Sequence, residues 1–250
     1  MNSIARFSDR VENYVKYRPD YPPQIIELMR DEMNLSENSI VADVGSGTGI
    51  FTRILLKNDC TVFGVEPNLA MREAGESFLR GFENFKSVDG TSENTTLPKE
   101  SVTHVIAAQA FHWFNTEQTR AEFRRVLKPN GFVVLIWNER QLDSTAFLRD
   151  YEQLLIDFGT DYVNVRHDNM TERGLREFFF DDFHERSFPN VQTVDFAGLK
   201  GRLLSASYAP NENHPRFAEM LAQLQDIFAR HERAGKVEIH YDTRVYYGEF

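Results

Sequence analysis

The fold is decided by the segment Val41-Ala42-Asp43-Val44-Gly45-Ser46-Gly47-Thr48-Gly49-Ile50-Phe51. Its first residues are β-branched or small and apolar, which predicts a short buried strand. Three glycines follow on alternate positions, and beyond them Ile50, Ile54 and Leu55 recur at helical spacing. Glycine suits a sharp turn from strand to helix, because it adopts positive φ and lets a ligand approach the backbone. Since a helix start also presents free N–H groups, the segment is typical of a nucleotide-binding turn.

The glycine spacing discriminates between cofactors. A dinucleotide fingerprint has the form G-x-G-x-x-G/A. From Gly45 this chain has G-S-G-T-G-I, so the third glycine comes one place early and Ile50 stands where a small residue is needed. Asp43 is also foreign to that fingerprint, since a carboxylate there suits a cationic group and would repel a pyrophosphate. A turn without any ligand is the remaining alternative, and three spaced glycines beside an acid argue against it.

The motif Asp-Val-Gly-Ser-Gly-Thr-Gly at residues 43–49 resembles the first motif of the class I S-adenosylmethionine-dependent methyltransferases. In that family the glycine turn faces the methionine part of the cofactor. The resemblance therefore implies S-adenosyl-L-methionine as cofactor and S-adenosyl-L-homocysteine as product. The residues that it places at the methionine end are Asp43, Gly45, Ser46, Gly47 and Gly49.

Alternating strand and helix patterns determine the expected fold class. Strands are predicted at 40–44, at 61–66, at the start of 85–93, at 102–109 and at 132–137. Their alternation with helical patterns favours a parallel sheet built from βαβ units. Further strands are predicted at 188–196 and 237–247. The resemblance then implies an α/β, Rossmann-like doubly wound seven-stranded sheet, mostly parallel with an antiparallel last strand beside the fifth.

The second predicted strand, residues 61–66, ends in the acid Glu66. A carboxylate at this place can accept hydrogen bonds from both hydroxyls of a ribose, as in other nucleoside-binding α/β folds. In the resembled family the next positions flank the ribose and adenine. They correspond here to Pro67, Asn68 and Met71. Asn68 also suits a helix cap, and the two roles are compatible.

The N-terminal phrase Tyr17-Arg18-Pro19-Asp20-Tyr21-Pro22 resembles the signature of a methyltransferase subgroup that includes trans-aconitate-methylating enzymes. There the arginine and tyrosines lie over the cofactor end of the cleft. The resemblance places Tyr17 and Arg18 at the cofactor and Tyr21 towards the acceptor. A guanidinium is well shaped to pair with the carboxylate of the methionine moiety. The alternative is a solvated loop with aromatic packing.

The loop at residues 90–98 resembles the adenine-side loop of the same family. Backbone N–H groups there recognise the ring, so the side chains carry little information. Thr91 and Ser92 are assigned to the cofactor on this basis. Polar residues in such a loop are also ordinary turn formers, which is the alternative.

The fourth predicted strand continues directly into Gln109-Ala110-Phe111-His112-Trp113-Phe114-Asn115, which resembles the fourth motif of the same subgroup. Ligands of doubly wound sheets lie at the carboxyl ends of the strands, so Gln109 and Ala110 are expected beside the cofactor. His112 and Trp113 are expected beside the acceptor, because aromatic faces attract a sulfonium and an imidazole can orient or deprotonate a nucleophile. Alternatively, both rings only shape the pocket by packing and hydrogen bonding.

Residues 139–185 are predicted to form a helical lid inserted between the fifth and sixth strands. Lids of this kind define an acceptor pocket and exclude water. Arg140 and Arg166 are the basic residues proposed to bind an anionic acceptor, although isolated arginines are more often solvated. His167 and Asp168 lack a third ligand at a recognised spacing, so no metal site is predicted.

We expect one methyltransferase domain over residues 1–250. Its parts are an N-terminal cofactor-covering segment (1–35), a cofactor-binding core (36–138), the helical lid insertion (139–185) and C-terminal strands and a helix that complete the sheet (186–250). The net charge of −10 argues against a nucleic-acid-binding surface. The single cysteine, Cys60, excludes an intramolecular disulfide. Without an apolar run of membrane-spanning length or a signal-like N-terminus, a cytoplasmic monomer or homodimer without membrane contact is expected.

The expected function is S-adenosylmethionine-dependent methyl transfer to a small-molecule acceptor, with a carboxylate as the favoured class. The cofactor supplies the activated leaving group, so the protein mainly positions the partners and shields charge. Two alternatives stay open. One is an NAD(P)-dependent oxidoreductase, and the other is a non-catalytic S-adenosylmethionine-binding module.

Overall fold

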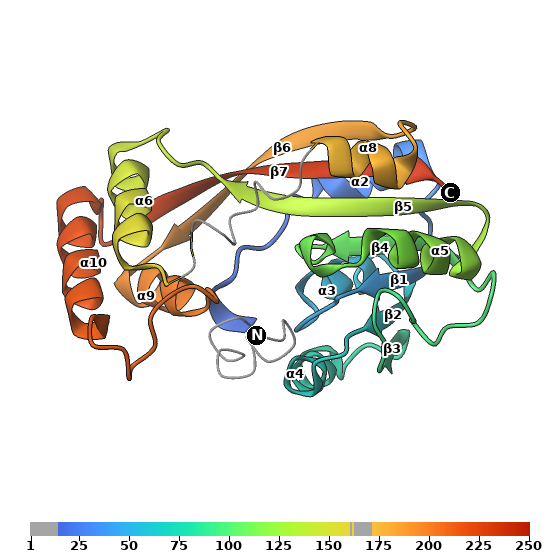
Figure 1. Cartoon of the computed structure of the whole chain (residues 1–250), viewed down its shortest axis with the longest axis horizontal. Coiled ribbons are helices and arrows are strands. Elements are labelled where there is room, and N and C mark those ends of the chain that lie inside the picture. Colours follow the sequence, from blue (N-terminus) through green and yellow to red (C-terminus); the bar gives the residue numbers. More distant parts are fainter. Residues whose placement is uncertain (1–14, 161, 163–171) are drawn as a thin grey trace.

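One seven-stranded sheet organises the computed structural model, which describes residues 15–160, 162 and 172–250 (Figure 1). The strands are β1 (Ile40–Val44), β2 (Thr61–Val65), β3 (Phe85–Val88), β4 (Val102–Ala108), β5 (Leu127–Arg140), β6 (His184–Val194) and β7 (Val237–Glu249). Their order across the sheet is β3-β2-β1-β4-β5-β7-β6. The order reverses between β1 and β4, and ligands of open α/β sheets bind at such a switch point.

The strand directions confirm the predicted fold class. Strands β1 to β5 are parallel to their neighbours, whereas β7 lies antiparallel between β5 and β6. The sheet is therefore doubly wound and mostly parallel, with an antiparallel last strand. Strand β5 is longer than the predicted 132–137, because its pairing with β7 continues from Phe132 opposite Glu249 to Arg140 opposite Tyr241.

Helices cover both faces of the sheet. They are α2 (Gln24–Met33), α3 (Ile50–Leu56), α4 (Leu69–Leu79), α5 (Thr116–Val126), α6 (Ala146–Phe158), α8 (Glu172–Phe179), α9 (Phe196–Leu204) and α10 (Phe217–His231), with the 3₁₀ turn η3 (Phe111–Trp113). Helices α2 and α3 share one hydrophobic cluster with Val134 and Ile136 of β5. Helices α5 and α8 share another with Val133 and Leu135. The alternation along β5 shows that each face of the sheet buries every second side chain.

A third hydrophobic cluster lies away from these two, at the far ends of β6 and β7 (Figure 1). It joins α6, α9 and α10 to the first residues of β7, Val237 and Ile239. The segment 139–185 thus contributes α6 to this cluster and α8 to the α5 face of the sheet. Its role as a lid stays a prediction, and Arg166 lies outside the described residues.

Within the part of the chain that the structure describes, no helix is both long enough and apolar enough to cross a bilayer. The cytoplasmic location and the oligomeric state stay predictions from the sequence.

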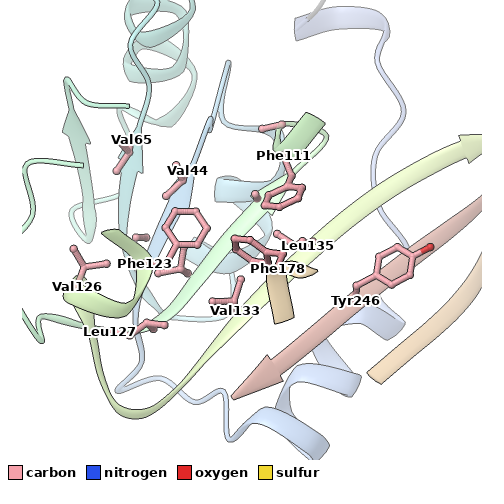
Figure 2. Packing of buried hydrophobic residues seen from close by; sticks show 14 of the residues in the cluster. Val44, Val65, Phe111, Phe123, Val126, Leu127, Val133, Leu135, Phe178 and Tyr246 are labelled. Atoms are coloured by element: carbon pink, nitrogen blue, oxygen red, sulfur yellow. The ribbon is translucent and has the colours of Figure 1, made fainter. Parts of the chain in front are cut away.

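Aromatic side chains fix α8 to the sheet. Figure 2 shows Phe111, Phe123 and Phe178 gathered over β4 and β5. The rings of Phe178 and Phe111 meet edge to face with centroids 4.5 Å apart, and Phe123 lies 6.2 Å from Phe178 in the same manner. Edge-to-face contacts add to the free energy gained by burying such rings. Phe178 therefore anchors α8.

We expect Phe178→Ala to lower the free energy of unfolding by about 3–5 kcal/mol, because it leaves a cavity among buried rings. The matched control is Phe180→Ala, two residues further on, where the ring is 54% exposed. The control should change stability by less than about 1 kcal/mol, since Phe180 mainly stacks on exposed arginines. Urea unfolding followed by fluorescence measures both. Equal losses would show that α8 is not anchored through Phe178.

Candidate cofactor-binding site

The glycine turn packs tightly against the loop that follows β4. Gly45 has a φ of +70°, and its N–H donates to the carbonyl oxygen of Val65 at 2.8 Å. A Cβ on Gly45 would lie 2.5 Å from the Cβ of Ala110, so no larger residue fits. Gly49 has a φ of +83°, and a Cβ there would meet Leu79 of α4 at 2.6 Å. Positive φ and close packing together explain why the turn requires glycine.

A cavity of about 290 Å³ opens beside this turn, at the carboxyl ends of β1, β2 and β4. Most of the predicted site residues line it, and they come from five separate stretches of sequence. They are Tyr21, Asp43, Gly45, Ser46, Gly47, Glu66, Pro67, Asn68, Met71, Thr91, Ser92, Gln109, Ala110 and Trp113. The fold therefore assembles one pocket from motifs that lie far apart in the chain.

Asp43 is the most buried charged group of the pocket, with 1% of its surface exposed. One carboxylate oxygen, Oδ2, accepts a hydrogen bond from Thr52 Oγ1 at 2.5 Å. Among the described residues, the other oxygen, Oδ1, has no hydrogen-bond partner. Burial raises the pKa of Asp43 to about 7, the hydrogen bond from Thr52 opposes this, and the negative charge of Glu66 adds to it. An unsatisfied buried oxygen at the pocket fits a cationic ligand group such as an ammonium.

Glu66 is held on the opposite side of the turn. Its Oε2 accepts from the backbone N–H of Gly47 and its Oε1 from that of Asn68, both at 2.9 Å. Burial raises its pKa, while these two N–H groups and Arg72 favour the charged form. Asn68 Oδ1 in turn accepts from Met71 N at 3.0 Å and caps α4, as predicted. Glu66 thus presents a fixed acceptor at the strand end, where a ribose is bound in related architectures.

The residue that follows β4 has an unusual backbone. Gln109 adopts a φ of +60°, which is uncommon for a residue other than glycine. Its N–H donates to Ile136 O at 2.9 Å and its Nε2 to Asn138 O at 3.3 Å, so β5 holds it in place. Such strained residues concentrate at ligand sites, where the surrounding structure imposes the conformation. Gln109 is therefore fixed at the pocket by long-range contacts.

Three predicted cofactor residues do not line the cavity. Gly49 caps α3 behind the turn. The ring of Tyr17 packs against α9, where a Cβ on Gly201 would lie 2.1 Å from it. Arg18 Nη2 donates to the carbonyl oxygen of Ser205 at 3.1 Å. The N-terminal segment therefore reaches the pocket through Tyr21, whose ring meets Phe51 edge to face at 5.1 Å.

Two predicted acceptor residues also lie outside the lining. His112 lies on η3 with its ring 4.8 Å from that of Trp113, which does line the cavity. Arg140 forms an ion pair with Glu152 and donates to Tyr162 Oη at 3.0 Å. The structure therefore turns this guanidinium towards α6 rather than into the cavity.

Sequence reasoning did not assign several residues that line the pocket. They are Thr48, Ile50, Phe51, Glu93, Ala108 and Phe114. All of them lie in or directly beside motifs that were identified, so a rule that includes each motif's neighbours would have found them. Glu93 lies in the predicted adenine-side loop and accepts from the N–H of Asn115 at 3.0 Å, which ties that loop to the one after β4. The sequence feature that could have assigned Glu93 to the pocket is its position within that loop.

In the ranges that the structure describes, no three His, Cys, Asp or Glu side chains gather in a way that would hold a metal ion.

Comparisons with known proteins agree with this geometry. A family model described as "Methyltransferase domain" matches residues 42–135. An uncharacterized methyltransferase of Schizosaccharomyces pombe is 36% identical over 150 residues, which is 60% of this chain and 58% of that protein. One from Mycobacterium bovis is 33% identical over 149 residues, with the same coverage of both chains. The chain thus spans little more than half the length of these relatives.

A solved structure from Anaeromyxobacter dehalogenans, described as that of a type II methyltransferase, superposes with a TM-score of 0.67. It is 21% identical and covers 93% of this chain and 98% of its own. With the sheet order and the glycine turn, these matches identify the class: the fold is that of the class I S-adenosylmethionine-dependent methyltransferases. The matched methyltransferase domain model covers residues 42–135, which is less than half of this chain.

Asp43→Asn should stabilise the ligand-free protein more at pH 8 than at pH 5. The folded-state pKa of Asp43 lies above its ordinary value, so the wild type loses stability as pH rises from about 4 to about 7. Asparagine carries no such charge, and the gain should grow by about 2 kcal/mol between the two pH values. Thermal unfolding at both pH values measures this. The exposed control Asp226→Asn should show no such trend, and a pH-independent gain at Asp43 would contradict the buried-charge account.

Proposed function

We propose that this protein transfers a methyl group from S-adenosyl-L-methionine to a small-molecule acceptor of the carboxylate class. The observation that carries the proposal is the pair of buried carboxylates, Asp43 and Glu66, on either side of one glycine turn in one cavity. A dinucleotide pyrophosphate would be repelled by this pair. A ligand with a cationic end and a ribose matches it.

The residues present fit the methionine end of this cofactor. Asp43 Oδ1 would accept from the ammonium group, which gives the buried carboxylate the partner that it lacks. Ser46 and Gly47 would bring their backbone close to the same end, and Thr48 offers a buried hydroxyl there. We also keep Tyr17 and Arg18 in this proposal as residues that cover the cofactor once it is bound, since Tyr21 of the same segment lines the cavity.

The nucleoside end is matched by the residues after β2 and β3. Glu66 would exchange its hydrogen bond with Gly47 for the ribose hydroxyls, or share it with them. The apolar side chain of Met71 and the polar loop at Thr91 and Ser92 would enclose the adenine. Glu93 holds this loop against the one after β4, so the adenine pocket and the transfer site are mechanically joined.

The chain's own contribution to the chemistry is positioning. When bound, S-adenosylmethionine supplies an electrophilic methyl group, whose bond to sulfur breaks with the electron pair left on sulfur as the acceptor's lone pair attacks. The protein has to align the acceptor and exclude water. Gln109, Trp113 and Phe114 line this end of the cavity, and the two aromatic faces can attract positive charge.

His112 is proposed to remove a proton from the acceptor. Its ring contacts Trp113 and lies outside the cavity lining. We therefore place it beside the acceptor rather than the cofactor. The carboxylate class rests on the likeness of residues 17–22 and 109–115 to trans-aconitate-methylating enzymes.

Calorimetric titration with S-adenosylhomocysteine and with NADH tests the proposal. The wild type should bind S-adenosylhomocysteine and give no heat with NADH. Glu66→Ala should weaken binding at least about tenfold, since hydrogen bonds to a charged acceptor contribute about 1.5–3 kcal/mol. The control is Glu73→Ala on α4, which is exposed and outside the cavity and should bind within about twofold of wild type.

Binding of NADH without S-adenosylhomocysteine would overturn the proposal in favour of an oxidoreductase. If S-adenosylhomocysteine binds but no tritium is transferred from labelled S-adenosylmethionine to any of a broad acceptor panel, the non-catalytic alternative would replace it.

A further inference from the structure

A buried guanidinium without a matching carboxylate lies on α9. Arg202 is 7% exposed, and its Nε donates to Tyr241 Oη at 3.2 Å. Nowhere in residues 15–160, 162 and 172–250 does a carboxylate form an ion pair with it. A guanidinium has five N–H donors and keeps its charge in proteins. Buried charges are normally paired, because removing them from water is costly.

The neighbours of Arg202 do not neutralise it. Tyr151, Tyr208 and Tyr241 interact electrostatically with the guanidinium, and the ring centroid of Tyr241 lies 6.0 Å from its central carbon. Burial raises the pKa of Tyr151 to about 12, so this hydroxyl stays neutral at physiological pH. The tyrosines offer polar and aromatic surface but no negative charge.

Arg140, which also interacts with Tyr151, differs from Arg202 because it has a carboxylate partner. Its central carbon lies 5.2 Å from the ring centroid of Tyr151, and it forms an ion pair with Glu152. Arg140, Glu152 and Arg202 together carry one net positive charge. Arg202 therefore carries a positive charge that no carboxylate of the described residues balances.

Contacts connect Arg202 to the cofactor cavity. Tyr241 Oη donates to Gln192 Oε1 at 3.3 Å, and Gln192 Nε2 donates to the carbonyl oxygen of Tyr17 at 2.8 Å. From Tyr17 the chain continues to Tyr21, which lines the cavity. Figure 1 shows this segment running between α9 and the sheet. Arg202 is thus linked through Tyr241 and Gln192 to the N-terminal segment, whose Tyr21 lines the cavity.

We propose that Arg202 binds a carboxylate of the methyl acceptor and so determines acceptor specificity. This rests on the methyltransferase function proposed above. A guanidinium binds a carboxylate through two parallel hydrogen bonds, whereas a neutral amide of the same shape leaves the buried charge unmatched. Acceptors with the acid replaced by an amide are therefore rejected.

Thermal unfolding in saturating S-adenosylhomocysteine tests this at constant ionic strength. The probes are succinate, glutarate and tricarballylate, each compared with its amide and with inorganic phosphate. At least one acid should raise the Tm of the wild type, and its amide and phosphate should not. Arg202→Gln should lose this response, and Arg202→Lys should keep part of it. The control Arg230→Gln, at an exposed arginine of α10, should respond as the wild type does.

For the acid that responds and accepts tritium from labelled cofactor, Arg202→Gln should raise KM at least tenfold. Its affinity for S-adenosylhomocysteine should stay within twofold of wild type, which a merely structural role would not predict. An equal response to acid and amide, a response to phosphate alone, or an unchanged acid response in Arg202→Gln overturns the inference. Those results leave the cofactor assignment intact, whereas no binding of S-adenosylhomocysteine by the wild type would remove the proposed function itself. If Arg202→Gln does not fold, the wild-type comparison and Arg202→Lys still decide.

Discussion

The close approach of the glycine turn to the loop after β4 is the constraint on which the site depends. Gly45 and Ala110 approach so closely that one additional carbon atom would clash. This contact brings the carboxyl ends of β1 and β4 together where the strand order reverses. It also points the N–H of Gly47 at Glu66, so the second strand is tied to the same turn. A larger residue in place of Gly45 would therefore push apart the ends of β1, β2 and β4, which all contribute residues to the cavity.

Two charged side chains of the described residues, Asp43 and Arg202, are buried without an oppositely charged partner. Asp43 lies on β1 and Arg202 on α9, and both are more than nine-tenths buried. Burial disfavours the charged form of Asp43, and the burial of Arg202 removes a guanidinium from water without a matching carboxylate. Perturbed charged groups of this kind cluster at functional sites, although ion-pair networks can produce them as well. Their opposite signs suit a ligand pair with an ammonium at one end and a carboxylate at the other.

The sequence allowed most residues that line the cavity to be predicted because their signals are local. Three stretches carry a signal that can be recognised within a few residues: the turn at 41–51, the acid Glu66 and the segment 109–115 after β4. The parallel sheet brings these stretches together because each lies at the carboxyl end of a strand. The surroundings of Arg140 and Arg202 could not be predicted in the same way. Their partners come from α6 and β7, and only the docking of these elements determines which arginine meets a carboxylate.

The proposed function assigns cofactor binding and acceptor choice to different parts of the chain. The matched methyltransferase domain, residues 42–135, contains the glycine turn, both pocket carboxylates and the string after β4. Arg140 and Arg202 lie beyond it, in the third hydrophobic cluster or at its border, and this cluster meets the core through the long strands β5 to β7. Substitutions within the third cluster can therefore alter the acceptor site while the packing of the cofactor turn is preserved. Under the proposed function, acceptor specificity therefore depends on α9 and its tyrosine neighbours, whereas cofactor binding depends on the core.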